Sequence, residues 1–162
     1  MNRFIFVFLC LFVVSCNHIE FVYKNDSNLI NPLYEKTKIN TSGDSLVYLS
    51  PYIPMVFGEN KDASFNLSIN IKEKTTKRSV ETNQATSNLG YELRFLYTLI
   101  SNDKNCVTYE KEILSNFSII PKSAGYNYGT DASLEKKYQI AVMNNLDQFI
   151  SFVSDVNINN CI

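Results

Sequence analysis

The sequence contains no tryptophan and a single histidine, His18, among its 162 residues. Because hydrolytic triads and most zinc sites depend on histidine, an isolated histidine argues against both kinds of site. No glycine-rich phosphate loop follows a strand-like segment either. The carboxylates are scattered, and the pair Glu110 and Glu112 is more typical of a solvated strand face than of an acid–base dyad. These absences predict a protein that is not an enzyme and that needs no metal or cofactor.

The sequence also lacks an excess of charge of either sign, because 15 Lys and Arg residues are balanced by 16 Asp and Glu residues. Without a net field, nucleic acid is not an expected partner. The one concentration of charge is the stretch KEKTTKRSVE, which contains Lys74, Lys77 and Arg78. Such a cluster can bind phosphate groups through charge-assisted hydrogen bonds, although a solvated connecting loop is the alternative reading.

The most apolar run extends from Phe4 to Val14 and is too short to span a membrane, which takes about 20 apolar residues. Arg3 precedes it and the small residue Ser15 ends it, as in a secretory signal. The motif VVSC that closes the run resembles a bacterial lipobox. This resemblance implies a signal peptide over residues 1–15 and a lipidated Cys16, with an outer-membrane address. Ordinary secretory cleavage beside an incidental cysteine is the alternative.

Of the four cysteines, Cys10 leaves with the signal and Cys16 carries lipid, so that Cys106 and Cys161 remain. In an oxidising compartment such a pair favours a disulfide. On the chain-entropy model a loop of this length would stabilise the fold by about 4 kcal/mol. A buried thiol and a separate terminal thiol are the alternative.

The mature chain has the length of one domain. Residues 16–34 are polar and rich in asparagine, and predict a tether that follows the lipidated cysteine. Residues 35–157 form the expected domain, and residues 158–162 its C-terminal tail. Within the domain, residues 33–40 include a candidate first strand.

A first helix is expected from a cap at Ser42 to Phe57. Pro51 and Pro54 each remove a hydrogen-bond donor and clash with the preceding turn, so that this helix should be kinked or broken.

Apolar and polar residues alternate in SFNLSINIK (64–72) and again in LGYELRFLYTLIS (89–101), which predicts half-buried strands. The polar stretch between them forms a loop or an extended hairpin arm. After a turn at residues 102–105, another strand should place Val107, Tyr109, Ile113, Phe117 and Ile119 on one face. The three strands form an antiparallel meander.

The period changes to that of a helix after Asp131, where Asp131 or Ser133 is the expected N-cap. The predicted fold is α+β: an antiparallel or mixed sheet of three to four strands, with a long C-terminal helix and a shorter, kinked N-terminal helix packed on one face. The apolar stripe of the long helix consists of Leu134, Tyr138, Ala141, Val142, Leu146, Phe149, Ile150 and Val153.

This order of elements resembles the LptE family of lipopolysaccharide-assembly lipoproteins. The resemblance covers roughly residues 64–153 and is strongest in VETNQATSNLGYELRFLYTLIS and in SNFSIIPKSAGYNYGTDASLEKKYQIAVMNNLDQFISFV. It implies a protein on the periplasmic side of the outer membrane that plugs the LptD β-barrel, helps it to fold and assists lipopolysaccharide transport. Because the family contacts lipopolysaccharide through basic loop residues, it also implies that role for Lys74, Lys77 and Arg78.

Two other functions fit the same residues. One is a different outer-membrane lipoprotein that acts as a scaffold or pilot, with the same anchor and a generic α+β domain. The other is a periplasmic ligand-binding module with a small apolar pocket between sheet and helix. Co-purification with a large β-barrel would favour the LptE-like function over both.

Overall fold

A computed structural model describes residues 31–59, 63–79, 87–119, 128–158 and 160–162, with side chains left out at 77–79, 87–88 and 128–131. The expected signal peptide and Cys16 lie outside the described residues. The described residues belong to one folded unit that begins at Asn31.

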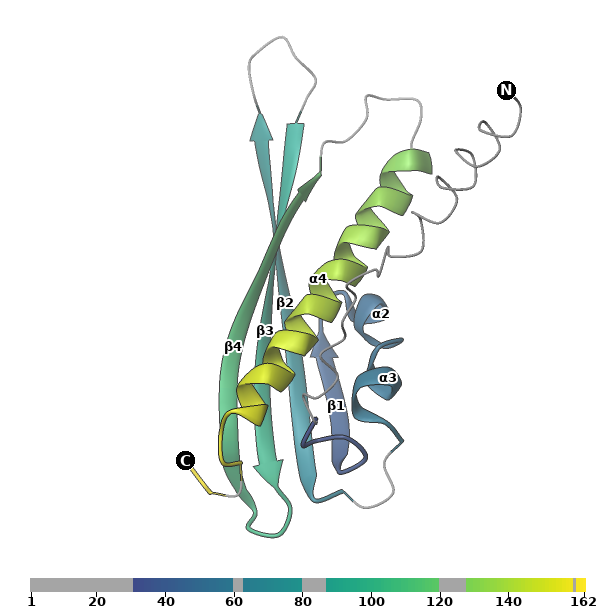
Figure 1. Ribbon diagram of the computed structural model, residues 1–162. Coiled ribbons are helices and arrows are strands. Elements are labelled where there is room, and N and C mark those ends of the chain that lie inside the picture. Colours follow the sequence, from purple (N-terminus) through teal and green to yellow (C-terminus); the bar gives the residue numbers. More distant parts are fainter. Residues whose placement is uncertain (1–30, 60–62, 80–86, 120–127, 159) are drawn as a thin grey trace, which may run out of the picture. The chain divides into compact units, whose positions relative to one another are not determined.

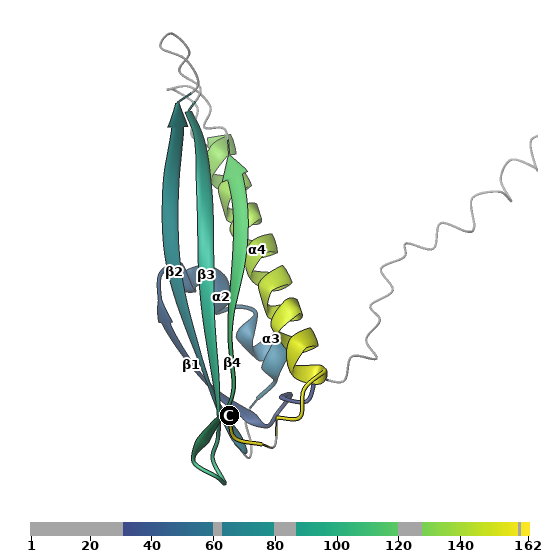
Figure 2. The same cartoon turned by 90° about the vertical axis from the view of Figure 1, so that its left-hand side faces the viewer.

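The folded unit has two layers, a sheet and a set of helices (Figures 1 and 2). The strands are β1 (Thr37–Gly43), β2 (Phe65–Ser79), β3 (Ser87–Ser101) and β4 (Cys106–Ile119), and they lie side by side in that order. β1 is parallel to β2, and the other two pairs are antiparallel. The helices are α2 (Leu46–Leu49), α3 (Ile53–Phe57) and α4 (Tyr128–Ser154). This arrangement confirms the predicted α+β fold with a mixed sheet.

The core lies between α4 and the inner face of the sheet. The alternation predicted for β2 and β3 is confirmed, because every second residue from Leu67 to Ile71 and from Leu93 to Leu99 is buried. The helical stripe is confirmed as well, from Tyr138 to Val153. Burying these side chains stabilises the fold by about 25 cal/mol for each Å² of apolar surface.

The N-terminal helix is broken, as its prolines predict. α2 and α3 are separate, and Pro54 lies in the first turn of α3, where a missing N–H is tolerated. The predicted cap at Ser42 is wrong, because Ser42 belongs to β1 and pairs with Asn70 of β2. The strand ends one residue later at Gly43, whose φ of 105° suits glycine and where a Cβ would clash with the Ile71 carbonyl.

Two further boundaries differ from the prediction. α4 begins at Tyr128, so neither Asp131 nor Ser133 is its N-cap. Gly129 falls in the first turn, where the backbone N–H groups have no helical partner and a glycine is better tolerated than in the interior. In β4, the register shifts so that Leu99 pairs with Tyr109 and Ile100 with Val107. This bulge leaves Thr108 unpaired and puts Val107 on the opposite face from Tyr109.

Both ends of the domain extend beyond the ranges expected for them. Leu33, in the expected tether, is fully buried, and its backbone N–H donates to the Asn31 side chain at 3.0 Å. In the expected tail, Ile158 is buried and Cys161 forms a disulfide with Cys106, with Cα atoms 5.8 Å apart. The structure therefore contains the bridge that the sequence left open, and it attaches the C-terminal tail to β4.

Candidate functional site

The two faces of the sheet differ in what covers them. Figure 2 shows α3 and α4 on one side of the long strands. On the same side, α2 contacts α4 through Tyr48, whose ring stacks on that of Tyr138 with the ring centroids 4.3 Å apart. None of the described helices covers the opposite face, which we call the outer face. Apart from Leu96, Ile100, Val107 and Leu114, the outer face of β2, β3 and β4 is largely polar and its residues are exposed or half-buried: Asn66, Ser68, Asn70, Lys72, Lys74, Thr76, Glu92, Arg94, Thr98, Glu110, Glu112, Asn116 and Ser118.

A groove of about 540 Å³ lies on the outer face, near the C-terminal end of β2 and the N-terminal end of β3. Its lining comes from three rows of register partners, of which Tyr91 and Phe117 form the middle one. The other two rows are polar apart from a glycine. Lys74, Glu92 and Asn116 form one row, and Thr76, Gly90 and Ser118 form the other. The groove thus offers an ammonium, a carboxylate, an amide and two hydroxyls, which together can donate and accept hydrogen bonds.

Gly90 forms the floor of this groove because it has no side chain. A Cβ at this position would lie 2.9 Å from Oγ1 of Thr76, which itself donates to the Gly90 carbonyl at 3.4 Å. A glycine inside a strand often marks a place where another group approaches the backbone closely. Sequence reasoning did not single out Gly90, although an isolated glycine in an alternating strand was the signal that could have done so.

The structure does not place the three predicted basic residues in one loop. Lys74, Lys77 and Arg78 all belong to β2, where Lys77 pairs with Leu89 and Arg78 with Asn88. Of the two alternatives for the polar stretch, the extended hairpin arm is therefore confirmed as far as Ser79, which pairs with Ser87. Lys74 lines the groove, whereas the side chains of Lys77 and Arg78 lie outside the described part.

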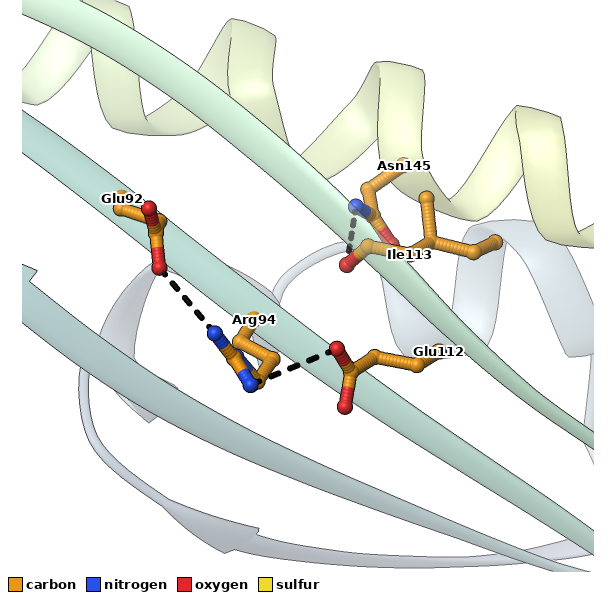
Figure 3. A network of polar contacts seen from close by, with 5 residues as sticks. All are labelled: Glu92, Arg94, Glu112, Ile113 and Asn145. Carbon is orange, nitrogen blue, oxygen red and sulfur yellow. Dashed lines mark hydrogen bonds and ion pairs between the residues drawn. The ribbon is translucent and has the colours of Figure 1, made fainter.

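An arginine that the sequence did not single out lies beside the groove. Arg94 is 3.4 Å from Glu92 and 3.5 Å from Glu112 on the neighbouring strand (Figure 3). Because about half of each of the Arg94 and Glu112 side chains is exposed, these ion pairs contribute little to stability, of the order of 0–1 kcal/mol. Their effect is to balance charge across the outer face, so that the ammonium of Lys74 is the cation that the groove presents.

A half-buried carboxylate joins the two layers at the other side of the sheet. The Tyr138 hydroxyl of α4 donates to Oε1 of Glu73 at 2.7 Å, and the Ser45 hydroxyl donates to Oε2. Burial and the bond to Glu73 both raise the pKa of Tyr138. The Tyr138 ring also packs edge-on against Phe117 at 4.9 Å. This contact set is structural, because it ties α4 and the start of α2 to β2.

A buried amide plays the same part near the middle of α4. Asn145 is only 1% exposed, and its Oδ1 accepts from the Tyr97 hydroxyl at 2.7 Å. Its Nδ2 donates to the Ser115 hydroxyl at 2.8 Å and to the Ile113 carbonyl at 3.4 Å (Figure 3). Burial raises the pKa of Tyr97, which keeps its hydroxyl neutral and able to donate. The helix thereby satisfies polar groups of the edge strand β4.

The described residues contain no group of three or more His, Cys, Asp and Glu side chains that could hold a metal ion. Among the helices that the structure describes, none is long and apolar enough to cross a membrane.

No family model and no curated protein matches the sequence. Solved structures do match. A candidate lipoprotein from Caulobacter crescentus has a TM-score of 0.58 at 6% identity, over 80% of this chain and 95% of that chain. Rare lipoprotein B from Shewanella oneidensis has a TM-score of 0.49 at 11% identity, over 72% and 96% of the two chains. A minor lipoprotein from Acinetobacter baumannii has a TM-score of 0.45 at 10% identity, over 75% and 94%. The Caulobacter likeness shows a shared fold.

Proposed function

We propose that this chain is an LptE-like outer-membrane lipoprotein, anchored on the periplasmic side through Cys16. In this role it plugs the LptD β-barrel and helps to assemble it for lipopolysaccharide transport. The observation that carries the proposal is the outer face, a long polar surface without a described helix over it. The interior of a membrane β-barrel is polar, so such a face suits a lumen wall better than an apolar face would.

The bridge and the fold support the location. Disulfides persist in oxidising compartments such as the periplasm, and this one joins Cys106 to Cys161. The fold is shared with a candidate lipoprotein.

The role is binding and not catalysis. In the groove, Lys74 is the residue that we propose for contact with a lipopolysaccharide phosphate, and Lys77 and Arg78 follow it on the same strand. The hydroxyls and amide of Thr76, Ser118 and Asn116 are suited to the sugar hydroxyls beside such a phosphate. An enclosed apolar pocket has less support, because sheet and helix pack directly, with the Tyr97 and Phe149 rings stacked at 4.1 Å.

The proposal is tested by purifying the tagged protein from detergent-solubilised outer membranes and by depleting it from cells. We expect a stable complex with a large β-barrel of the LptD kind. Depletion should lower the amount of properly assembled LptD and sensitise cells to hydrophobic antibiotics. A lipoprotein that purifies with another partner, while LptD assembly stays normal on depletion, would be a scaffold or pilot. A monomer that retains a small lipid or metabolite would be a binding module.

A further inference from the structure

The segment that connects β1 to β2 has an outward surface without charge. No charged residue occurs between Asp44 and Glu59, and this stretch folds as α2 and α3. Leu49 and Phe57 are buried and point toward the core, so the exposed residues of the two short helices and their connection point away from it. We call these exposed residues the α2–α3 surface, and they are Val47, Ser50, Pro51, Pro54 and Met55.

The two large side chains of this surface are unusually open to solvent, since Val47 is 72% and Met55 70% exposed. The neighbouring helix in the same layer is different. On α4 the exposed apolar residues Ile140 and Met143 are interspersed with charged ones such as Glu135, Lys136 and Asp147, as is normal for a helix facing water. An exposed apolar surface on one element, beside a charged one, marks a site of contact with something other than water.

The α2–α3 surface also lies where the chain from Cys16 enters the folded unit. The Asn31 side chain donates to the Val56 carbonyl at 2.6 Å, and the Glu35 N–H donates to the Phe57 carbonyl at 2.7 Å. Tyr34 and the exposed Glu35 both lie beside Gly58, where a Cβ would be 3.0 Å from the Tyr34 ring and 2.8 Å from Cγ of Glu35. The Glu35 carboxylate therefore marks the charged border of the α2–α3 surface. The first described residues are therefore attached directly to α3.

The length of the connecting chain limits how far the folded unit can lie from the anchor. Only residues 17–30 separate Cys16 from Asn31, and even a fully extended chain of that length reaches about 50 Å. A lipid on Cys16 would therefore keep α3 within about 50 Å of the bilayer, so that the α2–α3 surface meets lipid at a high effective concentration.

We propose that the α2–α3 surface contacts the membrane that holds Cys16, with Val47 and Met55 at the boundary between headgroups and acyl chains. This inference rests on the anchoring part of the proposed function and not on the barrel. An uncharged surface loses no ionic hydration when it enters lipid. Tyr34 and Tyr52 flank it, and tyrosine is enriched at membrane interfaces because its ring is apolar and its hydroxyl polar. The surface thus adds a second, protein-borne contact to the acyl anchor.

The absence of tryptophan gives a direct test. In the mature, acylated full-length protein, Met55→Trp introduces the only indole. The protein is reconstituted into vesicles of phosphatidylethanolamine and phosphatidylglycerol, with acyl chains either plain or brominated just below the headgroup. We expect the emission of the Met55→Trp variant to shift to the blue and to lose most of its intensity with the brominated lipid. Adding Val47→Glu should restore the intensity.

Two other single-tryptophan variants serve as controls. The side chains that they replace are exposed to a similar degree. Ile140→Trp lies on the exposed side of α4, where 48% of the isoleucine is exposed, and Leu114→Trp on the outer face, where 49% of the leucine is exposed. Both should keep their intensity in brominated vesicles. Equal quenching of all three indoles, or none at Met55→Trp, would overturn the inference. A blue shift without bromine quenching would mean a protein covers the surface, and would overturn it as well.

The mass of the N-terminal peptide separates this inference from the proposed function. If Cys16 is acylated and the Met55→Trp indole stays in water, the inference alone fails. If Cys16 is not acylated, the anchor fails and the inference fails with it.

Discussion

At the scale of single residues, Lys74 and Lys72 form a natural pair for testing the groove. Both are exposed on the outer face of β2, but only Lys74 lines the groove. If the ammonium of Lys74 meets a lipopolysaccharide phosphate, Lys74→Ala should weaken binding by about 10- to 150-fold, since a charge-assisted hydrogen bond contributes roughly 1.5–3 kcal/mol. Lys72→Ala should change the affinity little. Binding of purified lipopolysaccharide by the full-length protein measures both.

The thermal midpoint of both lysine variants should match that of the unchanged protein, because exposed side chains contribute little to stability. Equal affinities for the two variants would remove Lys74 from the proposed binding site. Adding Lys77→Ala and Arg78→Ala to Lys74→Ala then shows whether the rest of the predicted set takes part.

Asn145 takes part in several of the buried polar contacts between α4 and the sheet. Asn145→Ala leaves the buried Tyr97 hydroxyl and the Ile113 carbonyl without this partner, so it should lower the free energy of unfolding by about 2–3 kcal/mol. Tyr97→Phe leaves one buried acceptor, Oδ1 of Asn145, without its donor and should cost about 1–2 kcal/mol. Equilibrium unfolding in urea measures both.

The neighbouring residue Asn144 is exposed on the same helix and serves as the control. Asn144→Ala should change the free energy of unfolding by less than about 0.5 kcal/mol. Because Asn145 and Tyr97 share a hydrogen bond, the double variant should lose less than the two single losses added together. Fully additive losses would argue against the bond.

At the scale of elements, the disulfide links the start of β4 to the tail that follows α4. It joins residues 55 apart in sequence, so on the chain-entropy model Cys106→Ser with Cys161→Ser should lower the free energy of unfolding by about 4 kcal/mol. A hydrogen bond also attaches the tail to β4, because the Ile162 N–H donates to the Val107 carbonyl at 3.0 Å. Unfolding in urea, followed by circular dichroism, measures the change.

The unchanged protein treated with a phosphine reductant is the matched control for the double serine variant, and the two should unfold at the same urea concentration. A loss below about 1 kcal/mol would mean that the unfolded chain gains little freedom when the bridge is absent.

Elements with a long, regular period could be predicted from the sequence, and boundaries could not. The alternation of Phe65 to Ile71 and the stripe from Tyr138 to Val153 report directly which face is buried. The cap at Ser42 failed because β1 extends to Gly43 to pair with β2, a tertiary contact that local sequence does not contain. Val107 was misplaced for a similar reason, since a bulge at Thr108 reverses the alternation.

The candidate site was less accessible from sequence than the fold. Lys74 was identified by its charge, but the groove exists because register brings Thr76, Gly90 and Ser118 into one row across three strands. Register is set by pairing between distant segments, so a single strand pattern cannot reveal it. Asn145 was missed because a polar residue within an apolar stripe looks exposed until its partners on β3 and β4 are known.

At the scale of the whole folded unit, the two faces of the sheet are divided between two tasks. The inner face holds the core, with Tyr97, Phe149 and the Asn145 contacts joining sheet to helix. The outer face is polar and carries the groove, so changes there can alter binding without disturbing the core. This separation is what allows the tests of Lys74 and of Asn145 to be read independently.

The strand order of the sheet, β1-β2-β3-β4, has a consequence for how the molecule is made. Every strand neighbours the one synthesised just before it, so loop-closure entropy stays small at each addition. The sheet can therefore zip up in the order in which a pore or ribosome delivers the chain, without waiting for later segments. Only the arrival of α4 and the closing of the bridge to Cys106 complete the shape.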